Sequence, residues 1–380
     1  MKRHFKGIRL RQHSIPLFKV FMADSVKEAV VRVLYSGYIG EGEEVREFEH
    51  EIAARLGVPG ALTVNAGTSA LHLAYHMCTD GAVDAEIITT PMTCTATNMP
   101  ILQNGARIVW ADVDPLTGNI DPNEIEGLIT KKTRAIVMVH WGGNPCDVAR
   151  ICEIGAKHGV KVIEDAAHAL GAVYRGQPIG QHSDFVVFSF QAIKHVTSVD
   201  GGCLVCKAPE DDARGRLLRW YGIDRTTPDP VDFRGELDIP EAGYKFHMNN
   251  VAAVIGRENL KHLDWILARH RENARFYDAA FREVNSIAVA PETPNGISAA
   301  WLYTIHVSNR DELMHKLTER GIGASKVHTR NDTHSAFARF RRPLPKCEEF
   351  NRTHLSIPVG WWVSAFDREQ VAEAVIKFAR

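Results

Sequence analysis

A lysine in the turn after a short apolar run could do covalent chemistry with an aldehyde. Lys194 follows the run DFVVFSF (184–190) and stands shortly before Gly201 and Gly202. A lysine amine can hold an aldehyde cofactor as a Schiff base, and its pKa falls when the side chain is partly buried. A single lysine at a strand end is more often a surface charge, so this chemistry depends on what the other strand ends supply.

Two adjacent carboxylates end a second apolar run. They are Glu164 and Asp165, in the segment VIEDAAHALGA (162–172). Adjacent strand residues point to opposite faces of a sheet, so only one of the two can face a given ligand. That carboxylate could lie against the cationic nitrogen of a ring, although an isolated Glu-Asp pair is more often a solvated turn.

A third run ends in the small-residue turn NAGTSAL (65–71), where a helix is expected to begin. Free N–H groups at a helix start, together with the hydroxyls of Thr68 and Ser69, can bind a phosphate, although the same residues are also an ordinary helix cap. Pyridoxal 5'-phosphate needs a helix N-terminus for its phosphate, a carboxylate for its ring nitrogen and a lysine for its aldehyde. All three occur in order at three strand ends, and their joint occurrence predicts this cofactor.

Seven short apolar runs alternate with amphipathic segments from about residue 60 onward. The runs cover 61–65, 86–91, 107–113, 134–141, 161–165, 184–190 and 202–206, and helix-like segments such as 69–78, 122–132 and 148–159 lie between them. Strands that alternate with helices predict an α/β fold with a mainly parallel sheet covered on both faces. Ligands of such sheets bind beyond the carboxyl ends of the strands, where the three motifs are expected to lie.

A long helical pattern at 249–281 leads out of this region. The segments that follow mix strands and helices, at 300–307, 311–321 and 368–380. We therefore expect an N-terminal segment and a large cofactor-binding domain over residues 1–255, followed by a linking helix and a smaller C-terminal α/β domain over residues 256–380.

Composition and charge exclude several classes of protein. The chain has 380 residues, 45% of them hydrophobic, and a formal net charge of −1, which gives no general attraction to nucleic acid or anionic lipid. No apolar run approaches the roughly 20 residues that span a membrane. Seven cysteines, and a basic opening (1–14) without the apolar core of a signal peptide, predict a cytoplasmic protein with reduced thiols. Cys203 and Cys206 form a lone C-x-x-C and are expected to be buried strand residues rather than zinc ligands.

Over nearly its whole length the sequence resembles the sugar aminotransferases of the DegT/DnrJ/EryC1/StrS family. The shared segments are SGYIGEGEEVREFE (36–49), NAGTSAL, GARIVWADVDPLTGNID (105–121), AIVMVHWGG (135–143), VIEDAAHALGA, FSFQAIK (188–194), GGCLV and GYKFHMNNVAAVIG (243–256). The resemblance implies a three-layer, aspartate-aminotransferase-like architecture, called fold type I, and an enzyme that uses pyridoxal phosphate to transfer an amino group.

The resemblance also implies roles for individual residues. Lys194 would form the Schiff base and move the substrate proton, and Asp165 would pair with the ring nitrogen. Some family members carry histidine in place of this lysine and are dehydratases, so the lysine favours amino transfer. The remaining residues expected to bind the cofactor are Gly67, Thr68, Ser69, Cys94, His168, Ser189 and Lys245.

Three of these positions depart from the family's pattern. His168 stands where the family usually has the glutamine of EDAAQ, and it can still hydrogen-bond the phenolic oxygen of the cofactor. Cys94 stands where an aromatic residue often stacks on the ring. Lys245, in GYKFHM, replaces an asparagine of GYNYRM that in the family reaches the cofactor phosphate of the neighbouring subunit. The resemblance thus implies a homodimer with shared active sites, whereas a lysine after a tight turn can also be a plain surface charge.

The substrate is expected to be a keto-sugar, and the amino donor an amino acid such as L-glutamate. By resemblance the sugar is a nucleotide-linked keto-deoxyhexose used in amino-sugar biosynthesis. Arg225 is expected to bind an anionic group, because a guanidinium suits phosphate. The segment KVHTRNDTHSAF (326–337) borders the sugar site in the family and supplies His328, Arg330 and Asn331 as candidates, although it could also be an exposed polar loop.

Two alternatives remain open. One keeps the chemistry but changes the substrate to a keto-cyclitol or an oxidised sugar acid. The other is a non-catalytic regulator built on this fold, which the intact lysine, aspartate and phosphate turn disfavour because a regulator needs no electron sink.

Overall fold

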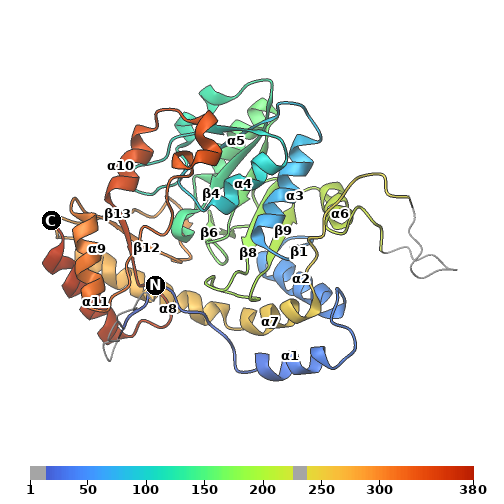
Figure 1. Ribbon diagram of the computed structural model, residues 1–380. Coiled ribbons are helices and arrows are strands. Elements are labelled where there is room, and N and C mark those ends of the chain that lie inside the picture. Colours follow the sequence, from blue (N-terminus) through green and yellow to red (C-terminus); the bar gives the residue numbers. More distant parts are fainter. Residues whose placement is uncertain (1–13, 226–237) are drawn as a thin grey trace, which may run out of the picture.

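A seven-stranded sheet lies at the centre of the structure (Figure 1), a computed structural model that describes residues 14–225 and 238–380. Apart from Ser14, the basic opening segment falls outside the described residues. The strand order is β1-β9-β8-β5-β4-β2-β3. The strands are β1 (Leu62–Val64), β2 (Glu86–Thr89), β3 (Arg107–Trp110), β4 (Thr133–Val139), β5 (Lys161–Asp165), β8 (Phe185–Ser189) and β9 (Gly202–Cys206). Each coincides with one of the seven runs predicted to be strands.

The sheet is parallel except for one strand. β9 runs antiparallel to both of its neighbours, β1 and β8, whereas the pairs among β8, β5, β4, β2 and β3 are parallel. Cys203 and Cys206 lie buried in β9, as predicted. Consequently the carboxyl ends of β4, β5 and β8 meet at one edge of the sheet, as the predicted site requires.

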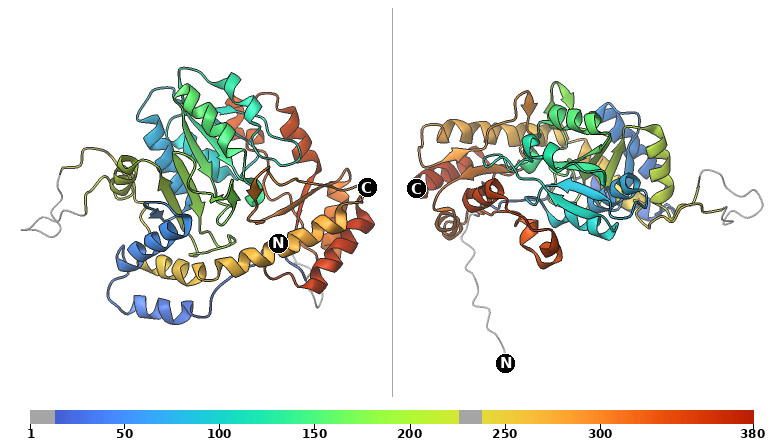
Figure 2. Two further views of the ribbon diagram at one scale, coloured as in Figure 1. Left: turned by 180° about the vertical axis from the view of Figure 1, so that it is seen from behind. Right: turned by 90° about the horizontal axis from the view of Figure 1, so that it is seen from above.

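Helices cover both faces of this sheet, because its strands are apolar on both sides (Figures 1 and 2). In β4, Ile136 and Met138 pack in one hydrophobic cluster, and Ala135 and Val137 pack in another on the opposite face. Helices α2 (Glu43–Leu56) and α5 (Val148–His158) contribute to the first cluster, and α3 (Gly67–Thr79) and α4 (Thr95–Gln103) to the second. The result is three layers around two cores.

The long helical pattern forms two helices that run end to end along one side of the molecule (Figure 1). They are α7 (Asn250–Leu260) and α8 (Leu263–Phe281). Two further helices, α1 (Val26–Leu34) and α6 (Pro209–Leu218), lie with the large sheet, where α1 packs on α7. Residue 255, the expected domain boundary, lies inside α7, and the division of the chain there remains a prediction.

A smaller antiparallel sheet with its own core forms the C-terminal part. Its strand order is β10-β12-β13, with β10 (Ala288–Val289), β12 (Tyr303–His306) and β13 (His354–Ile357). Helices α9 (Arg310–Glu319) and α11 (Ala365–Phe378) pack with it, and α10 (Pro345–Thr353) precedes β13. A third small sheet, β11-β6-β7, pairs β11 (Gly296–Ile297) with β6 (Val173–Tyr174), which also pairs with β7 (Gln177–Pro178).

One predicted helix is wrong. The segment 122–132 forms two short 3-10 turns, Pro122–Glu124 and Glu126–Leu128, instead of a helix. Asp121 caps the first turn by accepting a bond from the Asn123 N–H, and glycine and β-branched residues follow, which disfavour a continuous helix. Among the described helices, none is long and apolar enough to cross a membrane.

The N-terminal segment connects the two parts of the structure. Ile15 exchanges backbone hydrogen bonds with Gly321 and Gly323 of the C-terminal part, and Trp362 donates to the Pro16 carbonyl. The chain then passes residues 17 and 18 and enters α1 beside α7. This path takes it across the carboxyl edge of the large sheet.

Candidate active site

The carboxyl ends of β4, β5 and β8 open into a cavity of about 600 Å³. Val139, Asp165 and Ser189, the last residues of these three strands, line it. The starts of α3 and α4, the N-terminal segment, the turn after β8, Trp301, Ser325, Val327 and His328 also line it. A parallel sheet binds its ligands at this edge, so the cavity lies where the sequence predicts the cofactor.

Lys194 reaches this cavity from the turn after β8. Its Nζ lies 3.8 Å from the centre of the Trp301 ring. Burial lowers the pKa of the amine to about 8, and the negative charge of Asp165 opposes part of that shift. Near neutral pH an appreciable fraction of such an amine is unprotonated, which is the nucleophilic form that Schiff-base chemistry requires.

Asp165 presents its carboxylate to the same cavity. Its Oδ2 accepts a hydrogen bond of 2.7 Å from the Thr97 hydroxyl, and its Oδ1 accepts one of 3.1 Å from the Ala167 N–H. Burial raises the pKa of this carboxyl group, and the two hydrogen bonds and Lys194 work against that rise. A fixed carboxylate of this kind would hold a proton on the ring nitrogen of a cofactor.

Glu164 points to the opposite face of the sheet, which confirms that only one carboxylate of the pair serves the cavity. It is fully buried, and His140 Nε2 lies 2.8 Å from its Oε2. The Cys146 N–H donates to His140 Nδ1 at 3.0 Å, so the ring proton must be on Nε2 and is donated to Glu164.

The predicted phosphate turn is built from close backbone contacts that need glycine. α3 begins at Gly67, which lines the cavity with Thr68. A Cβ on Gly67 would lie 3.0 Å from the Ser189 Cβ, and a Cβ on Gly202 would lie 2.5 Å from the Gly67 nitrogen. Ser69 does not line the cavity; its hydroxyl donates to Asn65 Oδ1 at 2.7 Å and so braces the turn.

One residue near the expected position of the cofactor ring, His168, has a buried polar atom without a hydrogen-bond partner. His168 lines the cavity with its ring stacked on Trp301, at a centroid distance of 3.9 Å and an angle of 19°. Its Nδ1 is buried without a hydrogen-bond partner, and burial holds its pKa well below the usual value, so the ring is neutral. Cys94, just before α4, also lines the cavity. A buried polar atom without a partner is expected where a ligand supplies one.

These groups fit pyridoxal phosphate. The cavity joins an amine for the aldehyde, a carboxylate for the ring nitrogen and an unpartnered imidazole nitrogen for the phenolic oxygen. For the phosphate it offers a helix start with the Thr68 hydroxyl, and the Ser189 hydroxyl at the end of β8. Among the described residues that line it, the charged ones are Lys194, Asp165 and Asp200. The wall that this chain supplies is therefore poor in cations for a phosphate and an anionic substrate.

The expected substrate residues fall in different places. His328 lines the cavity; its Nε2 is buried without a partner, and burial lowers its pKa to about 3. Arg330 instead forms a two-bond ion pair with Asp332, at 3.0 and 2.7 Å. Asn331 is fully buried and donates to the Thr93 carbonyl at 2.8 Å. Neither Arg330 nor Asn331 is among the described residues that line the cavity.

Lys245 and Arg225 lie together on the surface, outside the cavity lining. Both contact the Trp220 ring, with Lys245 Nζ at 3.5 Å and Arg225 Cζ at 4.4 Å from its centre. Arg225 also pairs with Glu41 at 3.3 Å. The two cations that were expected to meet anionic groups are thus neighbours on one indole ring.

Sequence reasoning missed several residues of the cavity. Thr97 belongs to a hydroxyl-rich segment, TTPMTCTAT (89–97), whose position after a strand was a usable signal. Trp301 and Phe18 gave no such signal, because their side chains reach the cavity through contacts between segments far apart in the sequence.

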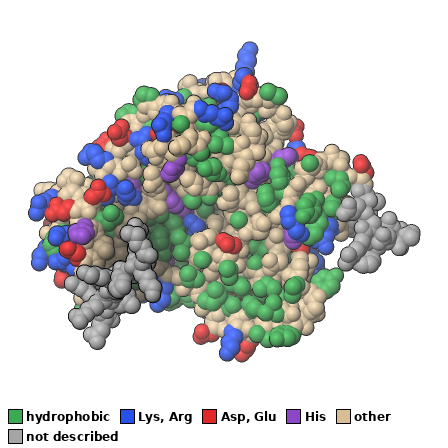
Figure 3. All heavy atoms as spheres, viewed as in Figure 1, with side chains coloured by type: hydrophobic (Ala, Val, Ile, Leu, Met, Phe, Trp, Pro, Cys, Tyr) green, Lys and Arg blue, Asp and Glu red, His purple; other side chains and the backbone are tan. Residues whose placement is uncertain are grey.

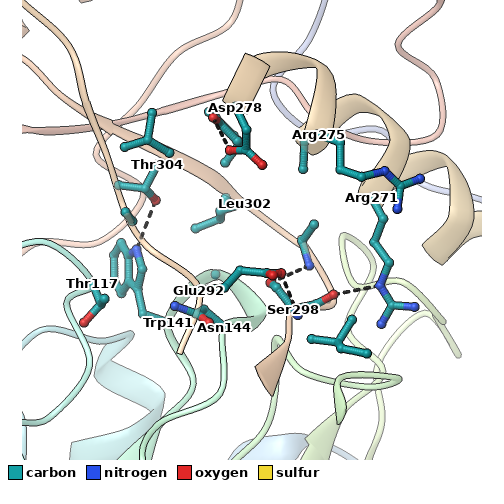
Figure 4. A pocket seen from close by; sticks show the side chains of 17 residues that line it. Thr117, Trp141, Asn144, Arg271, Arg275, Asp278, Glu292, Ser298, Leu302 and Thr304 are labelled. Atoms are coloured by element: carbon teal, nitrogen blue, oxygen red, sulfur yellow. Dashed lines mark hydrogen bonds between the residues drawn. The ribbon is translucent and has the colours of Figure 1, made fainter. Parts of the chain in front are cut away.

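A second cavity, of about 190 Å³, lies between α8, β12 and the segment after β4 (Figure 4). Trp141 donates to the Thr304 hydroxyl there, and Arg271 donates to the Ser298 carbonyl. None of the predicted cofactor or substrate residues is among the described residues that line it.

Comparisons with known proteins cover almost the whole chain. The model of the DegT/DnrJ/EryC1/StrS aminotransferase family matches residues 21–376. A UDP-4-amino-4,6-dideoxy-N-acetyl-beta-L-altrosamine transaminase of Campylobacter jejuni is 31% identical over 87% of this chain and 88% of its own. The sugar aminotransferase CalS13 from Micromonospora echinospora superposes with a TM-score of 0.92 at 39% identity, over 96% of this chain and 100% of its own. AtS13 from Actinomadura melliaura superposes with a TM-score of 0.92 at 42% identity, over 96% and 99%.

Proposed function

The chain belongs to the DegT/DnrJ/EryC1/StrS aminotransferase family, and from this we propose that it transfers an amino group from L-glutamate to a nucleotide-linked keto-deoxyhexose. Membership makes it a pyridoxal-phosphate-dependent sugar aminotransferase of amino-sugar biosynthesis, with fold type I architecture. The donor, the nucleotide and the deoxyhexose are the proposed part. We also propose a cytoplasmic location, which suits the seven free thiols of the described chain.

The observation that carries the proposal is the convergence of Lys194 and Asp165 on one cavity. Lys194 Nζ, with a pKa of about 8, can both release and accept a proton near neutral pH, as a residue that moves the substrate proton must. The bound cofactor supplies an electron sink for the carbon that carries the amino group. Asp165, held by Thr97 and Ala167, keeps a negative charge where that sink needs a protonated ring.

The other residues hold the cofactor in place. We assign its phosphate to Gly67 and Thr68 at the start of α3 and to Ser189 at the end of β8, and its phenolic oxygen to His168. Ser69 supports the phosphate turn through Asn65. Cys94 lies beside the ring position but offers less surface than an aromatic residue, so we expect looser cofactor binding than in relatives with a stacked ring.

The second chain of a homodimer would supply the missing cations. We propose that Lys245 and Arg225 enter the partner's cavity, Lys245 to bind the cofactor phosphate and Arg225 to bind an anionic group of the sugar substrate. Both are exposed, and the cavity's own lining lacks an arginine among the described residues. A twofold interface makes such sharing reciprocal.

An exposed apolar surface supports this assembly. Hydrophobic side chains gather on the face over α1 (Figure 3). In and after α1 they include Val31, Leu34, Tyr35, Tyr38 and Ile39, which are between 49% and 87% exposed. Apolar patches of this kind mark protein interfaces, and we propose that a second copy of the chain covers this one.

Subunit mixing tests the shared site. Lys194→Ala and Lys245→Ala should each be nearly inactive as homodimers. After the two are unfolded and refolded together, a mixed dimer carries one site with both lesions and one with neither, so activity should return. No recovery in proven mixed dimers would place Lys245 in its own chain's site or in none.

The sugar substrate can be identified from half-reactions. The pyridoxamine form of the enzyme should regain the absorbance of lysine-bound cofactor when it is mixed with a nucleotide-linked keto-deoxyhexose, and free keto-sugars should be poorer. Lys194→Ala is the control, because it cannot form that species. The UDP-sugar transaminase named above supports the nucleotide linkage. A response to a keto-cyclitol or an oxidised sugar acid alone would replace this substrate, and no response to any of them would favour a regulator.

A further inference from the structure

Trp301 contacts the catalytic lysine and also holds it in place through the backbone. The side chain is 3% exposed and lies just before β12 in the C-terminal part. Lys194 Nζ sits 3.8 Å from its ring centre. The Trp301 Nε1–H donates at 2.9 Å to the carbonyl of Ile193, the residue immediately before the lysine.

The same ring organises two other sides of the cavity. His168 stacks on it at 3.9 Å, and Phe18 of the N-terminal segment stacks at 5.1 Å with an angle of 26°. Trp301, His168 and Phe18 all line the cavity. One indole therefore joins the lysine turn, the segment after β5 and the N-terminal segment that crosses the sheet edge.

The Trp301 ring is the main contact of the Lys194 amine, because no charged side chain among the described residues binds that amine directly. Asp165 acts on Lys194 by charge, but in the parts of the chain that the structure describes no carboxylate forms an ion pair with it. The other titratable groups that face it are Cys94, His168, His195 and His328, and burial holds the three histidines neutral.

We propose that Trp301 is a positioning residue for Lys194: its ring holds the lysine ammonium at the edge of the cavity whenever the amine is not bound to the cofactor. This rests on the proposed function, because amino transfer frees the lysine in each half-reaction. The contact would keep the amine in the lining of the cavity, from which it can return the proton.

An aromatic ring suits this task better than a carboxylate would. A carboxylate at contact distance favours the charged form of an amine and raises its pKa by one or more units. A ring face attracts the ammonium by a smaller amount. The ring therefore fixes the position of the amine and leaves it able to titrate near neutral pH.

Trace labelling of the free amine tests the proposal without turnover. In the pyridoxamine form, the pH dependence of Lys194 acetylation by acetic anhydride, read by peptide mass spectrometry, gives its pKa. Trp301→Leu should lower that pKa by about 0.5 to 1.5 units, because the ammonium loses the ring. Trp301→Phe keeps an aromatic face but loses the N–H and the five-membered ring of the indole, so its pKa should fall between those of Trp301→Leu and the wild type. Trp265→Leu changes a tryptophan of α8, outside the cavity lining, and should leave the pKa of Lys194 unchanged.

Two results would overturn the proposal. An unchanged pKa in Trp301→Leu would show that the ring does not hold the ammonium. Equal shifts in Trp301→Leu and Trp301→Phe would assign the effect to the bond with Ile193. If Trp301→Leu does not fold, Trp301→Met fills more of the volume without a ring and is read in the same way. Should the protein bind no cofactor, the proposed function fails, while labelling of the free lysine in that protein still decides the role of Trp301.

Discussion

Asp165→Asn removes the one carboxylate that β5 presents to the cavity and changes little else. The side chain is 4% exposed, and its two oxygens accept from different donors, the Thr97 hydroxyl and the Ala167 N–H. The single oxygen of the amide can accept from one of these donors. The substitution therefore keeps the size and part of the bonding of the group. It removes the charge that would hold the cofactor's ring nitrogen protonated.

The expected loss of kcat can be calculated from the burial of the Asp165 carboxylate. Breaking a buried pair of opposite charges costs about 3 to 5 kcal/mol. If that cost falls on the rate-limiting proton transfer, kcat drops by a factor of about 150 to 5,000. Cofactor should remain partly bound, because Lys194 and the phosphate turn are untouched.

The neighbouring carboxylate provides a matched control. Glu164→Gln makes the same chemical change one residue earlier in β5, on the opposite face of the sheet, where His140 can still donate to the amide oxygen. Stopped-flow absorbance with L-glutamate would follow the first half-reaction in both variants. Near-wild-type rates in Asp165→Asn, or an equal loss in Glu164→Gln, would refute the assignment of Asp165 to the ring nitrogen.

Three further outcomes follow from the geometry. In the pyridoxamine form, the rate of the half-reaction that needs the neutral amine of Lys194 should rise with pH and level off above about 8, because the pKa is lowered to that value; a flat profile between pH 6 and 9 would contradict it. Gly202→Ala should lower the free energy of unfolding by about 1 to 3 kcal/mol and weaken cofactor retention, since its Cβ would meet the Gly67 backbone. The Cβ of Gly127→Ala would have no atom within 4 Å, so this control should leave the thermal unfolding temperature unchanged. Arg225→Ala should raise the KM for the nucleotide sugar; if neither it nor Arg330→Ala changes that KM, both substrate assignments fail while the cofactor site stands.

The features that the sequence predicted well are local. β5 could be predicted because KVIED is a short apolar run that ends in charged residues, and the alternation of a strand already placed Glu164 and Asp165 on opposite faces. Gly202, which the sequence places shortly after Lys194, lies so close to the Gly67 backbone that a Cβ would not fit there. The seven strands of the large sheet share this property, since each is marked by its own residues.

The features that the sequence did not predict depend on packing between distant segments. The antiparallel direction of β9 is set by where its connections leave the sheet, and no local pattern encodes it. Trp301 lies 107 positions after Lys194 but contacts it, and Phe18 reaches the same ring from the other end of the chain. The ion pair between Arg330, a candidate for the sugar site, and Asp332, two residues away, was likewise not predicted.

Borohydride reduction tests the central claim, that Lys194 carries the cofactor, most directly. The purified protein should be yellow, and reduction should fix the cofactor irreversibly to one lysine, which peptide mass spectrometry identifies. We predict a single labelled peptide that contains Lys194, and no label in Lys194→Ala. Label on a different lysine, or a protein that binds no pyridoxal phosphate, would contradict the account.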